Sequence, residues 1–352
     1  MKKIVTLVLA IVMIAAVMLT GCSGGTTADG TEQVTLNFLN WGDYIEPTVI
    51  EQFEKANPDI KINMTTVPSN EEMYAIASTE GCEIDVMVPS EYMVEQFMAE
   101  DLLAEIDKSK LSNFKNVEEF SKTRTFDPDS QYSVPYTWGT LGILYNTTMV
   151  SDPRPSFDML WDEKYSGQIY MYDSIRDAFA AALGYRGYDI NTRSEEEIAE
   201  AGQALIDQRP LVQAYGTDDL RDSMIAGSGA MALIYSGDAT YCIEQNEDLA
   251  FVVPEGTNFF VDNFVILKSS DQQEAAHRFI DFLMEPEIAK LNAEYIGYST
   301  PNEPALEIIS PDYLQYNSFN PSDEEIARAT YFRDLGDFIS VYNDQWMKVK
   351  TS

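Results

Sequence analysis

Short apolar strands alternate with amphipathic helices along most of this chain, and that alternation limits the possible folds more than any other feature. Residues 34–40 and 60–64 alternate apolar and polar side chains, which is typical of half-buried strands. Between them, Pro47 favours the start of a helix and Pro58 its end. The same patterns predict strands at 83–88, 168–172, 230–235, 249–253 and 263–267, and helices at 70–78, 90–102, 174–183, 194–208 and 272–284. This βαβ rhythm predicts an α/β fold.

No internal repeat, low-complexity tract or long linker divides the 352 residues. A chain of this length commonly forms two compact units. We therefore expect two α/β lobes around a central cleft, joined by crossings inside the fold rather than by a single linker. The crossings are expected near residues 136–138 and 260–262.

The first 21 residues are predicted to be an export signal. Lys2 and Lys3 precede an uncharged apolar run at 4–19, which is too short to be read as a membrane span. The run ends in Leu-Thr-Gly before Cys22, which resembles the lipobox of bacterial lipoproteins. We predict a lipoprotein signal peptide at 1–21, removed so that Cys22 is lipidated, and a lipidated tether at 22–32. The alternative is a plain signal peptide with an incidental cysteine.

Two further cysteines, Cys82 and Cys242, remain after lipidation. In an exported protein they could pair, but their separation along the chain does not show whether their Cα atoms lie close enough. Two buried free thiols are the favoured alternative.

Acidic residues far outnumber basic ones: 58 Asp and Glu against 23 Lys and Arg give a formal net charge of −35. Nucleic acid is excluded as a partner, because a chain this acidic repels phosphates. The single histidine, His277, cannot build a multi-histidine metal centre, and we expect it to be partly exposed on its helix. A negative surface steers cations inward, which points to a positively charged small ligand.

Aromatic and acidic side chains recur where the predicted strands end. Ligands of open α/β sheets bind beyond the carboxyl ends of the strands. One such residue alone is usually a packing or helix-capping residue, but the repetition at four strand ends indicates a site. The residues are Trp41, Asp43 and Tyr44; Ser90 and Tyr92; Asp173 and Asp177; Tyr235 and Asp238; and a predicted turn, Phe259 to Asp262, that leads into the strand at 263–267.

Carboxylates and flat aromatic faces together suit a linear aliphatic polycation. An ammonium group that leaves water must meet a fixed anion, because an unpaired buried charge is very costly. The methylene segments between ammonium groups need an apolar wall that tolerates cations, which aromatic rings provide through dispersion and cation–π attraction.

At these residues the chain resembles the polyamine-binding component of spermidine/putrescine ABC transporters, from about Val34 to its end. The matching stretches are Asn40-Trp-Gly-Asp-Tyr-Ile45, Ser69-Asn-Glu-Glu-Met-Tyr74, Val88-Pro-Ser-Glu-Tyr92, Ile106-Asp-Lys-Ser-Lys-Leu111, Ser133-Val-Pro-Tyr-Thr-Trp-Gly139 and Ile296-Gly-Tyr-Ser-Thr-Pro-Asn302. The resemblance implies a bilobal, periplasmic-binding-protein-like (type II) α/β fold, with lobe 1 at 33–137 plus 261–306 and lobe 2 at 138–260 plus 307–352. It implies a binding protein rather than an enzyme, with no cofactor or metal, and a permease and an ATPase supplied by other chains.

The resemblance also implies which residues line the cleft. Asp262 would pair with an internal or proximal amine and Asp177 with a terminal one, while Trp41, Tyr235 and Phe260 would wall the methylenes. Asp43 and Asp238 match acidic positions of putrescine-preferring relatives. The full predicted set is Trp41, Asp43, Tyr44, Ser90, Tyr92, Asp177, Tyr235, Asp238, Phe260, Asp262 and Tyr298.

Three departures from the family pattern leave putrescine and spermidine both open as ligands. Ser174 stands where spermidine binders carry a second acid, and Tyr235 stands where Trp is common. Arg333 falls near a site that is often Gln, where it could repel a long ligand or pair with Asp334.

Other functions are kept as alternatives. The same fold could bind ferric iron through tyrosine oxygens, or another small cation, and paired carboxylates could serve a glycosidase. Gly227-Ser-Gly229 lacks the context of a nucleophile elbow. The favoured interpretation is an exported, lipid-anchored monomer on the extracytoplasmic side of the cell membrane, which captures putrescine or spermidine for import.

Overall fold

A nine-stranded mixed sheet forms the centre of the molecule in the computed structural model, which describes residues 33–217 and 219–352. The strands are β1 (Val34–Asn40), β2 (Ile60–Thr66), β3 (Val86–Met87), β4 (Ser133–Asn146), β5 (Ile169–Tyr172), β6 (Val212–Gly216), β7 (Met231–Tyr235), β8 (Leu249–Val252) and β9 (Phe259–Ile266). Their order is β2-β1-β3-β9-β4-β7-β5-β6, and β8 pairs with β4. The predicted α/β architecture is confirmed.

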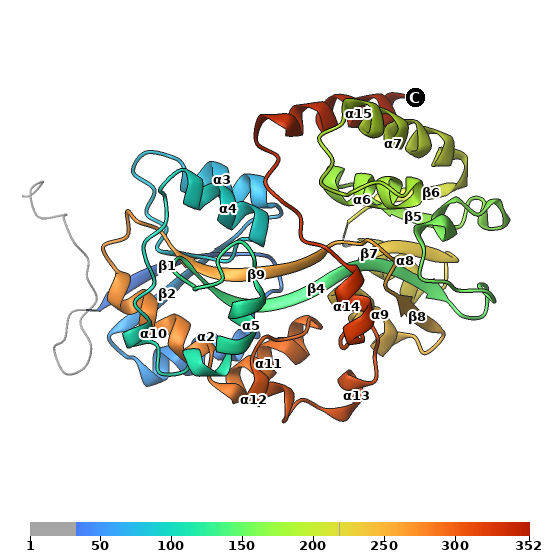
Figure 1. The fold of residues 1–352 in the computed structure, drawn as a ribbon. Coiled ribbons are helices and arrows are strands. Elements are labelled where there is room, and N and C mark those ends of the chain that lie inside the picture. Colours follow the sequence, from blue (N-terminus) through green and yellow to red (C-terminus); the bar gives the residue numbers. More distant parts are fainter. Residues whose placement is uncertain (1–32, 218) are drawn as a thin grey trace, which may run out of the picture.

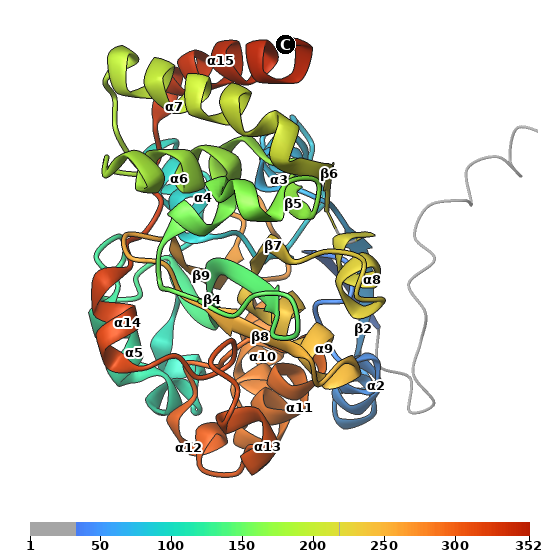
Figure 2. The same ribbon diagram turned by 90° about the vertical axis from the view of Figure 1, so that its right-hand side faces the viewer.

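Helices cover both faces of the sheet (Figures 1 and 2). They are α2 (Pro47–Ala56), α3 (Asn70–Ala77), α4 (Glu91–Ala99), α5 (Glu118–Thr123), α6 (Ile175–Arg186), α7 (Glu195–Gln208), α8 (Asp219–Ile225), α9 (Ser236–Gln245), α10 (Gln273–Leu283), α11 (Pro286–Ile296), α12 (Glu303–Leu306), α13 (Pro311–Leu314), α14 (Asp323–Arg328) and α15 (Ile339–Thr351). Within the described ranges, no helix combines the length and apolarity needed to cross a membrane.

Strand β4 connects the two halves of the molecule. Its first part, up to Thr140, pairs antiparallel with β9, and its second part, from Leu141, pairs with β7 and β8. Figure 1 shows β4 and β9 running side by side between the β1–β2 half and the β5–β7 half. The register shifts between Pro135 and Thr137, as expected for a proline inside a sheet, because proline has no N–H to donate to the neighbouring strand. The residues at which the crossings were expected, 136–138 and 260–262, lie on β4 and β9.

Each half has its own hydrophobic core. On one side, Phe38 and Phe53 pack against Phe279 of α10, with ring centroids 5.2 and 4.9 Å from it. On the other side, Phe179 of α6 packs 5.3 Å from Tyr342 of α15, and α15 lies against α7 (Figures 1 and 2). The two cores meet at Tyr235, which packs against both of them.

Several local predictions are wrong. Phe259 to Asp262 is not a turn but the first part of β9, because its backbone pairs with β4. The strand predicted at 83–88 is only two residues long, and β4 and β6 were not predicted. His277 is buried rather than partly exposed: its Nε2 accepts a 2.9 Å hydrogen bond from the backbone N–H of Asp107, which packs over the helix.

Cys82 and Cys242 are free thiols, as favoured from the sequence; Cys242 is buried and Cys82 is half-buried.

A fully buried arginine holds the base of β4 to β9. The guanidinium of Arg124 donates to Asn263 at 2.6 Å, to Ser133 Oγ at 2.9 Å and to Ser130 Oγ at 2.5 Å. The Asp127 carboxylate caps the same loop by accepting from the backbone N–H and the hydroxyl of Ser133. Burial lowers the pKa of Arg124 to about 10, so it stays charged at neutral pH.

Replacing this arginine should destabilise the protein strongly. Arg124→Met keeps the apolar stem but leaves the buried acceptors without a donor, which we expect to lower the free energy of unfolding by about 3 kcal/mol or more. Arg278→Met, which breaks the partly exposed ion pair with Asp59, should cost about 1 kcal/mol or less. Urea unfolding of both variants measures the difference, and equal losses would contradict the role given to Arg124.

Candidate functional site

A buried carboxylate on β9, Asp262, is at the centre of the site. It is 4% exposed. The hydroxyl of Tyr44 donates to Oδ2, and Ser90 Oγ donates to Oδ1 at 2.6 Å. Asn70 fixes Ser90 through two 3.1 Å hydrogen bonds, one to its hydroxyl and one from its backbone N–H. The loop after β1 and the start of α4 thus meet on one acidic side chain.

Burial raises the pKa of Asp262 to about 6, although the hydrogen bonds from Ser90 and Tyr44 work in the opposite direction. The carboxyl is consequently poised to change its protonation state near neutral pH. A cation placed against it would favour the ionised form.

A second buried carboxylate, Asp177, lies in the first turn of α6 and is 2% exposed. Its Oδ2 accepts from Tyr235 at 2.7 Å and from Ser174 at 2.5 Å. Its Oδ1 has no hydrogen-bond partner within the part of the chain that the structure describes. Burial raises the pKa of Asp177, which the two hydroxyl donors oppose. Ser174, one of the three departures noted from the sequence, therefore helps to hold Asp177 in place.

A third carboxylate, Asp238, lies in the first turn of α9. Its Oδ2 accepts from the hydroxyl of Tyr172 at 2.8 Å, and that hydroxyl in turn accepts from the backbone N–H of Tyr235 at 3.2 Å. Its Oδ1 lies 3.3 Å from Nη1 of Arg221. Each of the three carboxylates is thus hydrogen-bonded by a tyrosine hydroxyl.

Tyr298 lies among these carboxylates. Burial raises its pKa well above the usual value, and so do the nearby charges of Asp238, Asp262 and, more weakly, Asp177. Its ring centroid lies 5.8 Å from that of Tyr44 and 5.4 Å from that of Phe260.

Glycines make the space for this ring. A Cβ on Gly237 would stand 2.6 Å from three ring atoms of Tyr298, and one on Gly139 would stand 2.8 Å from the rings of both Tyr298 and Phe260. The apolar wall of the site therefore depends on positions that tolerate no side chain.

The remaining predicted residues lie at the edges of this cluster. Trp41 is half-buried; its Nε1 donates to the carbonyl of Val88 at 2.8 Å, and its ring packs 6.4 Å from that of Tyr44. Tyr92 is half-buried against Phe332. Asp43 is exposed, with a left-handed φ of 45°, on the turn after β1. The structure therefore does not bring Asp43 among the buried carboxylates.

Arg333 neither pairs with Asp334 nor enters the cluster. Its guanidinium binds Glu95 of α4, with Nη2 2.6 Å from Oε1 and Nε 3.1 Å from Oε2. The Arg333 guanidinium is thus paired with an acidic side chain of α4 rather than with Asp334.

Four residues of the site were not found from the sequence: Tyr136, Tyr172, Arg221 and Glu91. Tyr136 donates to the carbonyl of Tyr44 at 2.9 Å and lies on β4, which showed no alternation. The only sequence signal for Tyr172 as a site residue was its position at the end of a predicted strand. Glu91 is 1% exposed, and its Oε2 accepts from the backbone N–H of Val261 at 3.0 Å. Burial raises the pKa of Glu91 to about 8.

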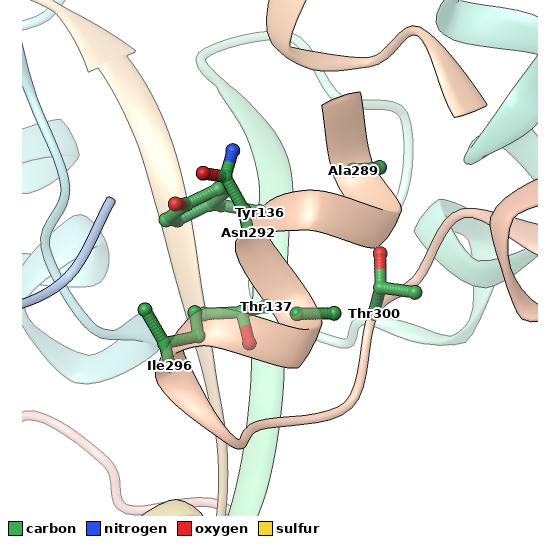
Figure 3. Close-up of a pocket in the computed structure, with 7 residues that line it drawn as sticks. Tyr136, Thr137, Ala289, Asn292, Ile296 and Thr300 are labelled. Carbon is green, nitrogen blue, oxygen red and sulfur yellow. The ribbon is translucent and has the colours of Figure 1, made fainter. Parts of the chain in front are cut away.

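A small hollow lies behind the site, between β4 and α11 (Figure 3). It has no room for a water molecule, and is lined by Tyr136, Thr137, Ala289, Asn292, Ala293, Ile296 and Thr300. These side chains are apolar or uncharged, so the hollow is a packing gap rather than a place for a cation.

The fold and this acidic, aromatic site define a solute-binding protein. Residues 48–320 match the family described as bacterial extracellular solute-binding protein, and the chain belongs to that family. It is 34% identical over 331 residues to the spermidine/putrescine-binding periplasmic protein of Salmonella typhimurium, covering 93% of this chain and 94% of the relative.

Two solved structures share the fold over nearly their whole length. A putative spermidine/putrescine ABC transporter protein from Listeria monocytogenes superposes with a TM-score of 0.84 at 36% identity, over 90% of this chain and 98% of that one. The Tp0655 (TpPotD) lipoprotein of Treponema pallidum gives 0.81 at 27% identity, over 90% and 100%. The predicted periplasmic-binding-protein-like α/β fold is confirmed.

The buried Glu91 should make stability depend on pH. The folded protein keeps the proton up to a pKa of about 8, whereas the unfolded chain releases it near 4.5, so stability falls as pH rises between these values. Its contribution to that slope is up to about 1.4 kcal/mol per pH unit. Glu91→Gln should therefore show a shallower fall in the free energy of unfolding between pH 5 and pH 8.

The exposed Glu80 provides the control for this experiment. Glu80→Gln should leave the pH dependence of urea unfolding unchanged. If the slope of Glu91→Gln equals that of the parent, Glu91 is ionised in the folded protein throughout this range.

Proposed function

We propose that this chain is an extracytoplasmic binding protein that captures a linear polyamine, putrescine or spermidine, and delivers it to an ABC permease driven by an ATPase. The observation that carries the proposal is the set of carboxylates on Asp177, Asp238 and Asp262, the first and last buried and Asp238 half-buried, each of which accepts a hydrogen bond from a tyrosine hydroxyl. The relatives named above as spermidine/putrescine-binding proteins support the same ligand class.

An ammonium group suits Asp262 and Asp177 better than a hydroxyl does. A charged donor makes a stronger hydrogen bond to a carboxylate than a neutral phenol does. It also compensates the buried negative charge, which tyrosine cannot. Asp177 has an unpartnered Oδ1 ready to accept such a donor. Two carboxylates on different elements would hold the two ends of the ligand.

Aromatic faces would contact the methylene chain between the ammonium groups. The ring of Tyr235 packs 5.4 Å from that of Phe260, which in turn packs against Tyr298. Trp41 extends this wall toward the surface through Tyr44. Such faces contribute about 0.5–2 kcal/mol each toward a cation. Asp43, Ser90, Tyr92 and Asp238 complete the proposed site.

Capture would couple ligand contacts to closure of the lobes. We place lobe 1 at 33–137 plus 261–306 and lobe 2 at 138–260 plus 307–352. Asp262, with Tyr44 and Ser90, belongs to lobe 1, whereas Asp177 and Tyr235 belong to lobe 2. A ligand that contacts both carboxylates binds the closed arrangement more tightly than the open one, and so shifts the population toward it.

The proposed function is binding without catalysis. A carboxylate-dependent glycosidase would need one carboxyl to act on a sugar, and the family that the chain belongs to consists of solute-binding proteins. Ferric iron as cargo would need several oxygen ligands facing one point. Here the hydroxyls of Tyr44, Tyr172 and Tyr235 are each committed to a different carboxylate.

Membrane attachment is proposed through Cys22, which lies outside the described residues together with the signal peptide and the tether. A lipid on Cys22 would keep a monomeric protein on the extracytoplasmic surface, close to its permease. The lipoprotein from Treponema pallidum, similar along nearly its whole length, supports this arrangement.

Calorimetric titration of putrescine, cadaverine, spermidine and spermine into the purified protein tests the proposed function. We expect saturable binding of at least one of these, and Asp262→Asn should weaken it at least tenfold, since removing one partner of a buried charge pair costs about 2–5 kcal/mol. Absence of heat from all four amines would refute the proposal.

A matched control separates the site from general charge. Asp207 lies exposed on α7, where it accepts only from Gln203 at 2.8 Å in the part of the chain described. Asp207→Asn removes the same charge and should leave affinity within about twofold. Unchanged affinity in Asp262→Asn, with the melting temperature retained, would remove Asp262 from the site.

Metabolic labelling with a radioactive fatty acid tests the proposed anchor. The protein expressed in its bacterial host should carry label and fractionate with membranes, whereas Cys22→Ser should be unlabelled. Label that persists in Cys22→Ser would contradict lipidation at this residue.

A further inference from the structure

The segment between α14 and α15 passes beside α4 and contacts it (Figure 1). Nη2 of Arg333 lies 2.6 Å from Oε1 of Glu95, and Nε of Arg333 lies 3.1 Å from Oε2. The backbone N–H of Asp334 also donates to Oε2, at 3.2 Å. In the proposed division into lobes, Glu95 belongs to lobe 1, whereas Arg333 and Asp334 belong to lobe 2. The ion pair therefore joins the two lobes.

Lobe 2 holds this segment in place through hydrogen bonds to its backbone. Oδ1 of Asn191 accepts from the backbone N–H of Arg333 at 2.8 Å, and Nδ2 of Asn191 donates to the carbonyl of Tyr331 at 2.8 Å. Arg176 of α6 donates to the carbonyl of Arg333 at 3.2 Å, and its guanidinium lies 4.2 Å from the ring centroid of Phe332. Three consecutive residues are thus tied to lobe 2, while the side chain of Arg333 reaches across to lobe 1.

A second contact between the lobes lies one turn earlier on α4. The ring of Tyr92 packs edge to face against that of Phe332, with centroids 6.3 Å apart, and the guanidinium of Arg176 lies 5.7 Å from the ring centroid of Tyr92. Residues three apart on a helix share a face, so Tyr92 and Glu95 both point toward lobe 2. Of these two, only Tyr92 belongs to the proposed polyamine site.

We propose that Glu95 and Arg333 form a latch, an ion pair that stabilises the closed arrangement of the lobes and slows the release of the ligand. The inference rests on the proposed function, because it gives a role in polyamine capture to residues outside the site. Since the ion pair joins the lobes, it breaks when they separate. It therefore raises the apparent affinity for any ligand that binds the closed arrangement. Both residues are positioning residues, because they act through closure rather than on the ligand.

Net charge and the latch make opposite predictions for Arg333. The protein is strongly acidic and the proposed ligand is a cation. Removal of a positive charge should therefore favour binding on electrostatic grounds, mainly by speeding association. Loss of the latch should instead speed dissociation, because the closed lobes open more readily. The dissociation rate of Arg333→Gln separates these two effects.

Stopped-flow fluorescence of putrescine and spermidine release from the purified protein tests the inference. Arg333→Gln and Glu95→Gln should each speed dissociation about threefold, as expected for a partly shielded ion pair. The double variant should dissociate no faster than either single variant, because both changes remove the same interaction. Added NaCl should narrow the difference between the parent and the variants, because salt screens the ion pair.

Arg328→Gln is the matched control. Arg328 also pairs with a glutamate, with Nη1 2.9 Å from Oε1 of Glu255, but both residues lie in lobe 2. The control removes the same charge and should leave the dissociation rate unchanged.

The parent dissociation rate in folded Arg333→Gln, or in Glu95→Gln should Arg333→Gln not fold, would overturn the inference and leave the proposed function standing. Additive effects in the double variant, or an equal increase in Arg328→Gln, would also overturn it. A parent that binds neither amine, nor cadaverine or spermine, would refute the proposed function as well.

Discussion

The withdrawal of two carboxylates, Asp177 and Asp262, from water is the constraint on which the site depends. Asp177 and Asp262 are almost fully buried, and burial favours their protonated forms. Hydroxyl donors partly offset that cost, since Tyr44 and Ser90 hold Asp262 while Tyr235 and Ser174 hold Asp177. Neutral donors satisfy the hydrogen bonds of a carboxylate but leave its charge uncompensated. A cationic ligand compensates that charge, and this is the physical reason for a preference for ammonium groups.

The two long strands determine where this chemistry takes place. Strand β4 pairs with β9 along its first part and with β7 and β8 along the rest, so the site forms where the two cores meet. Small residues at this junction matter as much as the acidic ones, because Gly139 and Gly237 admit the ring of Tyr298 among the carboxylates. The buried guanidinium of Arg124 fixes the base of the same strand pair. The strand pair that joins the two halves therefore also positions the side chains of the site.

The sequence predicted the features that local patterns encode. Strand β1 and helix α2 were predicted within a residue or two, because alternation and flanking prolines are local signals, and the residues at the strand ends followed from them. Strand β4 was missed because nearly all of its side chains are buried, which removes the alternation on which the prediction depends. The burial of His277 depends on a segment distant in sequence, and the pairing of Arg221 with Asp238 depends on how two consecutive helices, α8 and α9, pack together. Residue patterns alone carry no record of such packing.

Proton release on ligand binding tests the central claim most directly. At pH 6 about half of the Asp262 carboxyls carry a proton in the free protein, and an ammonium group must displace it. Putrescine should therefore be titrated by calorimetry at pH 6 in two buffers of different ionisation enthalpy, and then at pH 8. The account predicts heats that differ between the buffers by roughly half a proton per ligand at pH 6, with a smaller difference at pH 8. Saturable binding with identical heats in both buffers at pH 6 would contradict it.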